Sequence, residues 1–176
     1  RIRVNCEEEC DFWYPSRFLM TKRTPIIGGN WKMNTIVESS VSLANAVASD
    51  LAGCGECDVV VYPPLPFLQA VHNAIDNSSI ALGAQNMWYE ESGAFTGETS
   101  AKMLKDVGVV SVLAGHSERR HLLGETNEIV AKKVVAGLQE GLQVVLCVGE
   151  TLQQREAGET LPVVLSQVEE GLAGVE

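Results

Sequence analysis

The sequence predicts an α/β protein built around a parallel sheet, on two observations. First, five short apolar runs, most of them rich in β-branched residues, alternate along the chain with segments whose apolar residues recur at spacings of three and four. Second, these runs are apolar along their whole length, which is typical of strands that helices cover on both faces. A chain of 176 residues is long enough for one such domain.

The first predicted strand is Ile26–Gly29. The next segment is predicted to start a helix at Thr35-x-x-Glu38, a capping box in which each side chain can bond a free amide at the helix start. The apolar stripe of that helix consists of Val37, Val41, Ala44, Ala48 and Leu51. Asp58–Tyr62 follows as a β-branched strand ended by two prolines, and Leu65–Ile75 as a short helix.

The third strand is predicted over Ile80–Gln85, with a long loop at 86–99 after it. The remaining elements continue the same alternation. They are a helix at Ser100–Asp106, a strand at Val109–Ala114, helical segments at Ser117–Leu123 and Thr126–Glu140, and a strand at Gln143–Val148. A last helix carries the stripe Leu161, Leu165, Val168, Leu172 and Val175.

Periodicity leaves two architectures open, a doubly wound open sheet and a (β/α) barrel. A dinucleotide site would need G-x-G-x-x-G after a strand, and only Gly53-Cys-Gly55-Glu-Cys-Asp58 comes near. That stretch precedes a strand and lacks the third glycine. The phosphate-binding pattern G-x-x-x-x-G-K-[ST] does not occur in the sequence.

Composition excludes several functional classes. With 23 acidic against 13 basic residues the net charge is −10 at pH 7, which argues against a nucleic-acid or anionic-membrane surface. The sequence contains no run of about 18 apolar residues, so we expect no membrane-spanning helix. An odd count of five cysteines, and a first stretch without the apolar region of a signal peptide, favour a reducing cytoplasm.

The first 19 residues differ from the rest because they mix polar, acidic and aromatic residues without a helix or strand period. We therefore divide the chain into an extension at 1–19 and a domain at 20–176, with Met20 as the expected true start. The extension is either a translated upstream artefact or a disordered segment.

The cysteines allow a zinc hypothesis. Cys6 and Cys10 form C-x-x-x-C, and Cys54 and Cys57 form C-x-x-C. The alternative, which we favour, is that these are ordinary surface and core thiols, because the two pairs lie far apart in the sequence. Cys147 lies within an apolar run.

Polar residues that follow the strands are the candidates for chemistry, because ligands meet the carboxyl ends of parallel strands. Asn30 and Lys32 supply an amide and an ammonium after the first strand. His116 follows the fourth strand, and Ser117 is predicted to be the N-cap of the next helix. The positive end of that helix would favour a neutral imidazole, which can donate a hydrogen bond to a developing oxyanion.

Each candidate has a plain structural alternative. His116 could be a core histidine bonded to a carbonyl, and Lys32 a surface residue. Glu118 could be a base or simply favour a helix N-terminus. Arg119 and Glu125 are expected to pair structurally. His72 and His121 are interpreted as ordinary surface residues on helices, and the aromatic residues of the 86–99 loop, Trp88, Tyr89 and Phe95, as interface elements.

Five segments, taken together in order and spacing, resemble the triosephosphate isomerase family. They are GGNWKMN at 28–34, YPPLPFL at 62–68, GAQNMWYEESGAFTGE at 83–98, GHSERR at 115–120 and VVLCVGE at 144–150. The resemblance runs from about Thr24 to the end. It implies the eight-stranded (β/α)8 TIM barrel, of which about five βα units are present here.

The resemblance also implies a reaction, the interconversion of dihydroxyacetone phosphate and glyceraldehyde 3-phosphate through an enediolate, without cofactor or metal. Lys32 would hold the phosphate and stabilise the enediolate, with Asn30 as a second substrate-binding residue. His116 would be the electrophile, and this family is itself the known example of a neutral catalytic imidazole. Glu118 and Ser117 would support the site.

By the same resemblance, the 83–98 loop would insert into a second subunit of a homodimer, with Thr96 reaching toward the neighbouring site.

The family's general base, a Glu after strand six, its glycine-rich lid and its last phosphate loops have no match in this sequence, and Glu169 and Glu170 cannot replace that base. Five strands would leave strands one and five as open edges. We expect the isolated chain to be a poor isomerase; the alternative function is an inactive truncated chain that binds a partner subunit.

Overall fold

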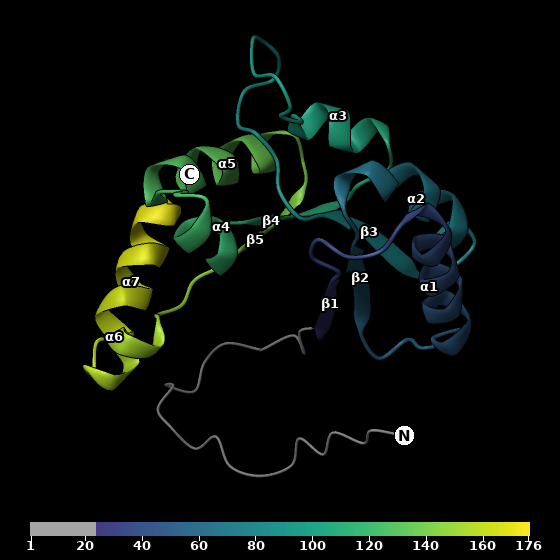
Figure 1. The fold of residues 1–176 in the computed structure, drawn as a ribbon, viewed down its shortest axis with the longest axis horizontal. Coiled ribbons are helices and arrows are strands. Elements are labelled where there is room, and N and C mark those ends of the chain that lie inside the picture. Colours follow the sequence, from purple (N-terminus) through teal and green to yellow (C-terminus); the bar gives the residue numbers. More distant parts are fainter. Residues whose placement is uncertain (1–23) are drawn as a thin grey trace.

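The computed structural model describes residues 24–176 and confirms an α/β fold with one parallel sheet. Its strands are β1 (Ile26–Asn30), β2 (Asp58–Tyr62), β3 (Ile80–Ala84), β4 (Ser111–Ala114) and β5 (Gln143–Leu146). The strands pair in sequence order, β1-β2-β3-β4-β5. A doubly wound sheet reverses its strand order, so the structure supports the barrel alternative and shows it as a curled half-barrel (Figure 1). The proposed extension at 1–19 and the start at Met20 lie outside the described residues.

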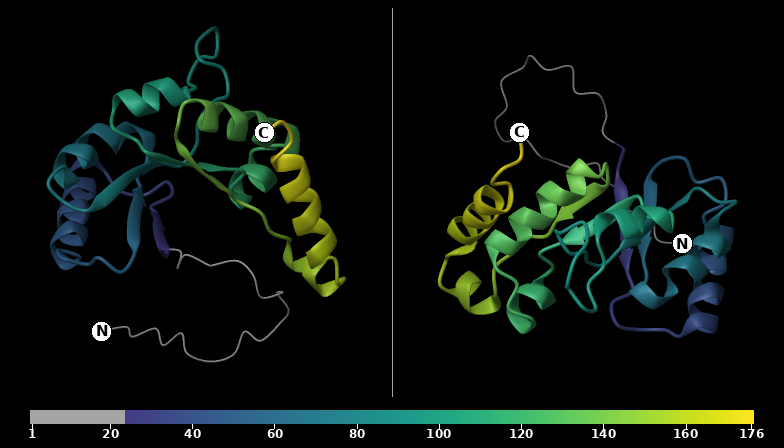
Figure 2. Two further views of the ribbon diagram at one scale, coloured as in Figure 1. Left: turned by 180° about the vertical axis from the view of Figure 1, so that it is seen from behind. Right: turned by 90° about the horizontal axis from the view of Figure 1, so that it is seen from above.

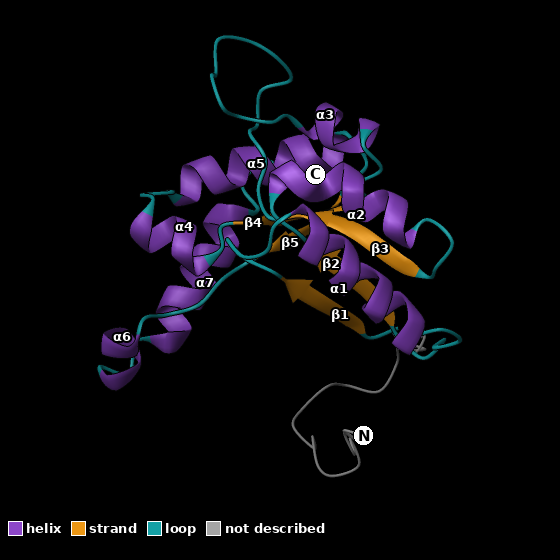
Figure 3. Ribbon diagram, turned by 45° about the vertical axis from the view of Figure 1, so that its right-hand side comes forward, coloured by secondary structure: helices purple, strands orange, loops and turns teal. Residues whose placement is uncertain are grey.

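The helices cover the convex side of this sheet, so that the molecule forms an arch with the strands on its inner side (Figure 2). They are α1 (Val37–Asp50), α2 (Leu68–Ile75), α3 (Ala101–Asp106), α4 (Ser117–Leu122), α5 (Asn127–Gln139), α6 (Leu152–Glu156) and α7 (Thr160–Gly171), with a 3-10 turn at Leu65–Phe67. Figure 3 shows the helices against the strands and the long loop between β3 and α3 standing clear of both.

The predicted capping box Thr35-x-x-Glu38 is wrong. The N-cap of α1 is Ile36, whose amide donates to Ser39 Oγ over 3.0 Å. Thr35 lies outside the helix in a left-handed conformation with φ of 77°, and its hydroxyl is 2.7 Å from Ser40 Oγ. The chain thus turns at Thr35, so its side chain cannot reach the free amides at the helix start.

The main core lies between the sheet and the helices. Val61 and Leu82 point outward from neighbouring strands and pack with Leu68 and Val71 of α2. The alternate residues of β2, Val60 and Tyr62, point to the inner side of the sheet, as the two-residue period of a strand requires. Both faces of the central strands are therefore buried, as predicted.

The two outer strands are open edges, as expected: β1 pairs only with β2, and β5 only with β4 among the described residues. The prediction that every strand is buried on both faces is wrong for β1, since Ile26 and Ile27 are 48% and 58% exposed. The predicted stripe of the last helix is also largely uncovered, because Leu161 and Leu165 are exposed.

The ring of Tyr62 packs on the inner side of the sheet, in a buried cluster with Val60 and Leu113. Tyr62 Oη lies 2.9 Å from Ser111 Oγ, and both residues are buried. The ring is held against Gly83, where an added Cβ would lie 2.3 Å from Tyr62 Cε1, and against Gly28, where it would lie 3.2 Å from Tyr62 Cε2. Glycine at position 83 is therefore required for the ring to fit.

We predict that Gly83→Ala lowers the free energy of unfolding by about 1–3 kcal/mol, because the added methyl group overpacks a buried site. Urea unfolding measures the loss. Gly55→Ala is the matched control, because no atom lies within 4 Å of a Cβ added there. Equal stability of the two variants would show that the Tyr62 ring does not occupy this position.

Candidate active site

A tight turn at the end of β1 aims Lys32. Asn30 is the last residue of the strand, and its Oδ1 accepts a hydrogen bond from the Lys32 amide over 2.9 Å. Lys32 has a φ of 55°, a left-handed conformation that costs about 1–3 kcal/mol for a residue other than glycine. Such strain persists only where the surroundings enforce it, so Asn30 serves first as the residue that sets the Lys32 backbone.

Gln85, which the sequence analysis did not select, holds the same turn from the other side. It follows β3 directly, and its Nε2 donates to the Lys32 carbonyl over 2.9 Å and to the Tyr62 carbonyl over 2.8 Å. The signal was available, because Gln85 is a polar residue at the carboxyl end of a predicted strand. The strand predicted over Ile80–Gln85 includes it, whereas the observed strand ends at Ala84.

His116 lies at the carboxyl end of β4 and caps α4. Its Nδ1 accepts a hydrogen bond from the Glu118 amide over 3.4 Å, so the N-cap is His116 and the prediction of Ser117 is wrong. Ser117 is the first residue of the helix, because the imidazole has taken the place of the capping hydroxyl. A ring nitrogen that accepts carries no proton, so the neutral ring bears its N–H on Nε2.

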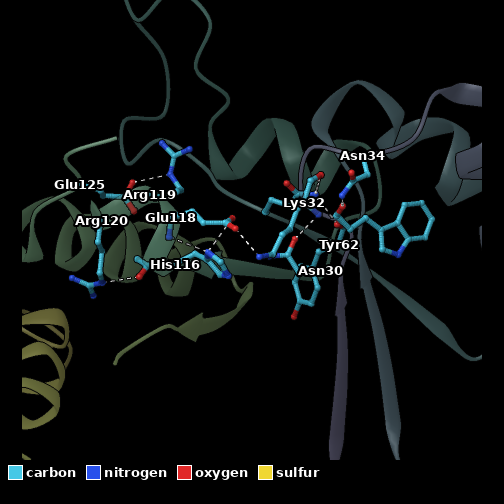
Figure 4. A network of polar contacts seen from close by, with 12 residues as sticks. Asn30, Lys32, Asn34, Tyr62, His116, Glu118, Arg119, Arg120 and Glu125 are labelled. Atoms are coloured by element: carbon cyan, nitrogen blue, oxygen red, sulfur yellow. Dashed lines mark hydrogen bonds and ion pairs between the residues drawn. The ribbon is translucent and has the colours of Figure 1, made fainter. Parts of the chain in front are cut away.

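Glu118 is paired with Lys32. Lys32 Nζ lies 2.6 Å from Glu118 Oε1, and both side chains are about half exposed. The hydrogen bond from Lys32 is the main reason that the pKa of Glu118 lies below its ordinary value. Glu118 Oε2 also lies 3.5 Å from His116 Nδ1, but that nitrogen cannot donate to it while it accepts the Glu118 amide. Figure 4 shows Lys32 and His116 both directed toward this carboxylate.

Arg120 fixes the backbone beneath His116. Its Nε donates to the Gly115 carbonyl over 2.6 Å, and its Nη2 to the Cys147 carbonyl over 3.2 Å. A further bond runs from Nη1 to Asn127 Oδ1. One guanidinium thus joins the ends of β4 and β5 to the start of α5, which uses the several fixed donors that only arginine offers.

A buried charge cluster lies next to α4. Arg119 Nε is 3.1 Å from Glu125 Oε1, which confirms the predicted pair, and the same oxygen accepts from Lys133 Nζ. Lys133 also donates to Asn86 Oδ1 over 2.7 Å and is 1% exposed. Burial raises the pKa of Glu125, but the two cations outweigh it and the pKa lies below the ordinary value. Lys133 holds this cluster next to the site without lining the cavity, and the sequence analysis does not single it out.

A cavity of about 360 Å³ lies at the carboxyl ends of β1 to β4. Its polar lining includes Asn30, Lys32, Gln85, His116, Glu118 and Arg119, together with Glu98 from the long loop. The structure therefore brings together four of the predicted site residues. Ser117 and Thr96 are exposed and do not line it. The arrangement offers an ammonium, an amide and an imidazole N–H to one small anionic ligand.

The structure also bears on the membrane, zinc and histidine predictions. No helix within residues 24–176 is long and apolar enough to cross a membrane. Over the same residues, no cluster of three or more His, Cys, Asp or Glu side chains could hold a metal ion. Cys6 and Cys10, which the zinc hypothesis needs, lie outside the part of the chain that the structure describes. His121 is exposed, as predicted, whereas His72 is half-buried.

The fold and this site define a protein of the (β/α)-barrel class with its polar site at the carboxyl ends of the strands. The family model described as triosephosphate isomerase matches residues 25–176. The chain belongs to the triosephosphate isomerase family.

Similar relatives carry the same name. Triosephosphate isomerase of Chlorobium phaeobacteroides is 52% identical over 155 residues, which cover 88% of this chain and 62% of that protein. The corresponding protein of Chlorobium luteolum is 51% identical over 87% of this chain and 62% of its own length. That of Thermoanaerobacter sp. is 48% identical over 87% and 61%. The chain thus spans about six tenths of the length of the curated relatives it matches.

We predict that Glu125→Gln lowers the free energy of unfolding by about 3–5 kcal/mol at neutral pH, because it leaves the buried Lys133 ammonium without a counter-charge. Urea unfolding measures the loss. Glu128→Gln is the control: Glu128 forms an exposed pair with Lys132, so its loss should leave the free energy of unfolding nearly unchanged. Similar costs for the two variants would contradict the buried-pair argument.

The pH dependence provides a second check on the same cluster. A carboxyl group whose pKa is lowered by folding stabilises the protein above its unfolded pKa of about 4.3. This stabilisation is lost as the pH falls through the lower folded pKa of Glu125. The stability difference between the wild type and Glu125→Gln should therefore be constant near neutral pH and should shrink on acidification below about pH 4.3.

Proposed function

We propose that this site takes part in the interconversion of dihydroxyacetone phosphate and glyceraldehyde 3-phosphate by proton transfer through an enediolate. The observation that supports the proposal is the placement of the Lys32 ammonium and the His116 imidazole on one cavity, with Glu118 between them. An anionic substrate with a carbonyl group needs both a cation and a hydrogen-bond donor at that spot. The names of the relatives point to the same substrate.

In the proposed mechanism, Lys32 attracts the phosphate and stabilises the negative charge that develops on the substrate oxygens. Its ion pair with Glu118 and its enforced backbone hold the ammonium in position before substrate arrives. His116 donates from Nε2 to the carbonyl oxygen, which becomes an oxyanion as the proton leaves the adjacent carbon. The amide of Asn30 is the second substrate-binding group, and Ser117 supports the first turn of α4. The proposed reaction uses no metal or cofactor.

Proton abstraction also needs a base. Glu118 is a poor candidate, because its ion pair with Lys32 keeps it ionised and weakly basic. Glu98, the other acidic residue on the cavity, belongs to the long loop. We therefore propose that residues 24–176 supply the electrophilic part of the site and that the 176-residue chain alone turns over slowly.

The first test separates binding from turnover. Glycerol 3-phosphate, a non-reacting analogue, should shift the ring nitrogen resonances of His116 in the purified chain, and Lys32→Gln should abolish the shift by removing the cation. In a coupled assay the turnover of the chain should be about 10²–10⁴-fold slower than that of the Chlorobium phaeobacteroides relative. This is the factor that general-base catalysis provides.

Lys132→Gln is the matched control, since Lys132 pairs with Glu128 on the surface of α5 and does not line the cavity. It should bind the analogue as the wild type does. An analogue that shifts His116 equally in both lysine variants would overturn the role of Lys32. Turnover near that of the relative would overturn the proposal that residues 24–176 supply only the electrophilic part of the site.

The long loop supports a second proposal, that this face binds another subunit, as in a homodimer. Phe95 is 39% exposed on the loop, beside the exposed Thr96, and Met33 is 95% exposed on the adjoining turn. Single exposed apolar side chains are common on protein surfaces, so the support lies in the position of Phe95 and Thr96 on a loop that stands clear of the sheet and helices. If the chain is inactive, subunit binding becomes its principal function. A cytoplasmic location, favoured by the cysteine usage, accompanies both proposals.

The matching test is sedimentation of the purified chain at micromolar concentration. We expect a dimer that Phe95→Glu converts to monomer, because the charge would be buried at the interface. Leu138→Glu, at an equally exposed position on α5, should leave the dimer unchanged. A monomeric wild type, or equal effects of both substitutions, would contradict subunit contact through the loop.

A further inference from the structure

A pair of cysteines lies at the opposite end of the sheet from the candidate site. Cys54 and Cys57 occupy the loop between α1 and β2, at the amino end of β2. The Cys54 amide donates to the Leu51 carbonyl over 3.0 Å at the end of α1. Directly after Cys57, the Asp58 amide donates to the Pro25 carbonyl over 2.8 Å, which starts the β1–β2 ladder. The pair thus spans the junction between a helix end and an edge of the sheet.

The two thiols are close enough to react with each other. Their sulfur atoms lie 3.8 Å apart at hydrogen-bond distance, and both residues are half-buried and not joined in a disulfide. A disulfide needs about 2.05 Å between sulfurs, so closure requires less than two ångströms of side-chain movement. Cys147, by comparison, is half-buried against the inner cluster of the sheet, and its thiol donates to the Val145 carbonyl over 3.7 Å.

Two other uses of a C-x-x-C motif fit this site poorly. Structural zinc needs four ligands, and the described residues offer no group of three around these thiols. Catalytic dithiols need a thiolate stabilised by a helix N-terminus or a cation. Here the loop follows the C-terminus of α1, and the hydrogen bond with Cys54 and the nearby Asp58 and Glu56 raise the pKa of Cys57. Such a pair exchanges slowly, as a structural dithiol does.

We propose that Cys54 and Cys57 form a redox-controlled staple, closing to a disulfide by exchange with a small dialkyl disulfide. One cysteine thiolate attacks a sulfur of the reagent, forming a mixed disulfide and releasing one alkyl thiolate. The second cysteine thiolate then attacks the protein sulfur of that mixed disulfide and releases the other alkyl thiolate. The two cysteines are oxidised, the reagent is reduced to two thiols, and the two protons pass to those thiols.

Mass spectrometry tests the closure. Cystamine is the probe, because its cationic ends suit a loop that carries Glu56 and Asp58. Trypsin releases residues 33–102 as one peptide whose only cysteines are Cys54 and Cys57. We expect this peptide from the treated wild-type chain to lose two hydrogen atoms and carry no adduct. Cys54→Ser and Cys57→Ser should each retain one cysteamine adduct, because the resolving thiol is missing.

Cys147→Ser is the matched control and should close its staple as the wild type does. A wild-type peptide that carries two adducts, or that stays reduced while the urea-unfolded chain reacts, would overturn the proposal.

Thermal unfolding tests the effect of closure. The oxidised chain should melt several degrees above the reduced chain, and dithiothreitol should reverse the gain, because the bond restricts the unfolded chain where α1 meets β2. In Cys54→Ser the oxidant should leave the midpoint unchanged. Equal midpoints for the oxidised and reduced wild type would overturn the staple. Analogue binding at Lys32 should be the same in both forms, so this test is independent of the proposed reaction.

Discussion

The parallel, in-order pairing of the five strands is the constraint on which the rest of the structure depends. It brings the carboxyl ends of all strands to one rim, so that residues 86 apart in the sequence, Lys32 and Glu118, come within 2.6 Å of each other. The register pairs Asn30 with Tyr62 and Ala114 with Leu146, which places the polar residues that follow at a common level. The site is a consequence of this alignment, and its polar groups come from the ends of β1, β3 and β4 and the segments that follow them.

The residues around the site hold its backbone more than its side chains. Asn30 and Gln85 both hold the turn that carries Lys32. Asn30 accepts a hydrogen bond from the Lys32 amide, and Gln85 donates one to the Lys32 carbonyl. Arg120 does the same for the end of β4. A reactive group placed to within a fraction of an ångström needs a supporting frame of this kind. The Lys32 side chain is about half exposed and the His116 side chain about one quarter exposed, so both are open to a ligand.

The sequence predicts most strands and helices to within a residue or two, because their apolar periods are local properties. It could not decide between an open sheet and a barrel, because both share those periods, and the resemblance made that choice. The caps at Thr35 and Ser117 were wrong because a cap depends on backbone torsion and on competing acceptors, here a left-handed turn and the His116 ring. Lys133 was missed because a lysine on a helix is normally solvated, and only the tertiary fold buries it against Glu125.

The open edge at β1 has a consequence for how the chain behaves in concentrated solution. Among the described residues β1 pairs on one side only and exposes Ile26 and Ile27, so its free edge is a template for lateral addition of other strands. The net charge of −10 opposes this, because like-charged molecules repel before their edges can meet. That repulsion acts only over the Debye length, which shrinks from about 10 Å at 0.1 M salt to about 3 Å at 1 M. Colloidal stability of this chain should thus be greatest in dilute buffer and decline as electrolyte is added.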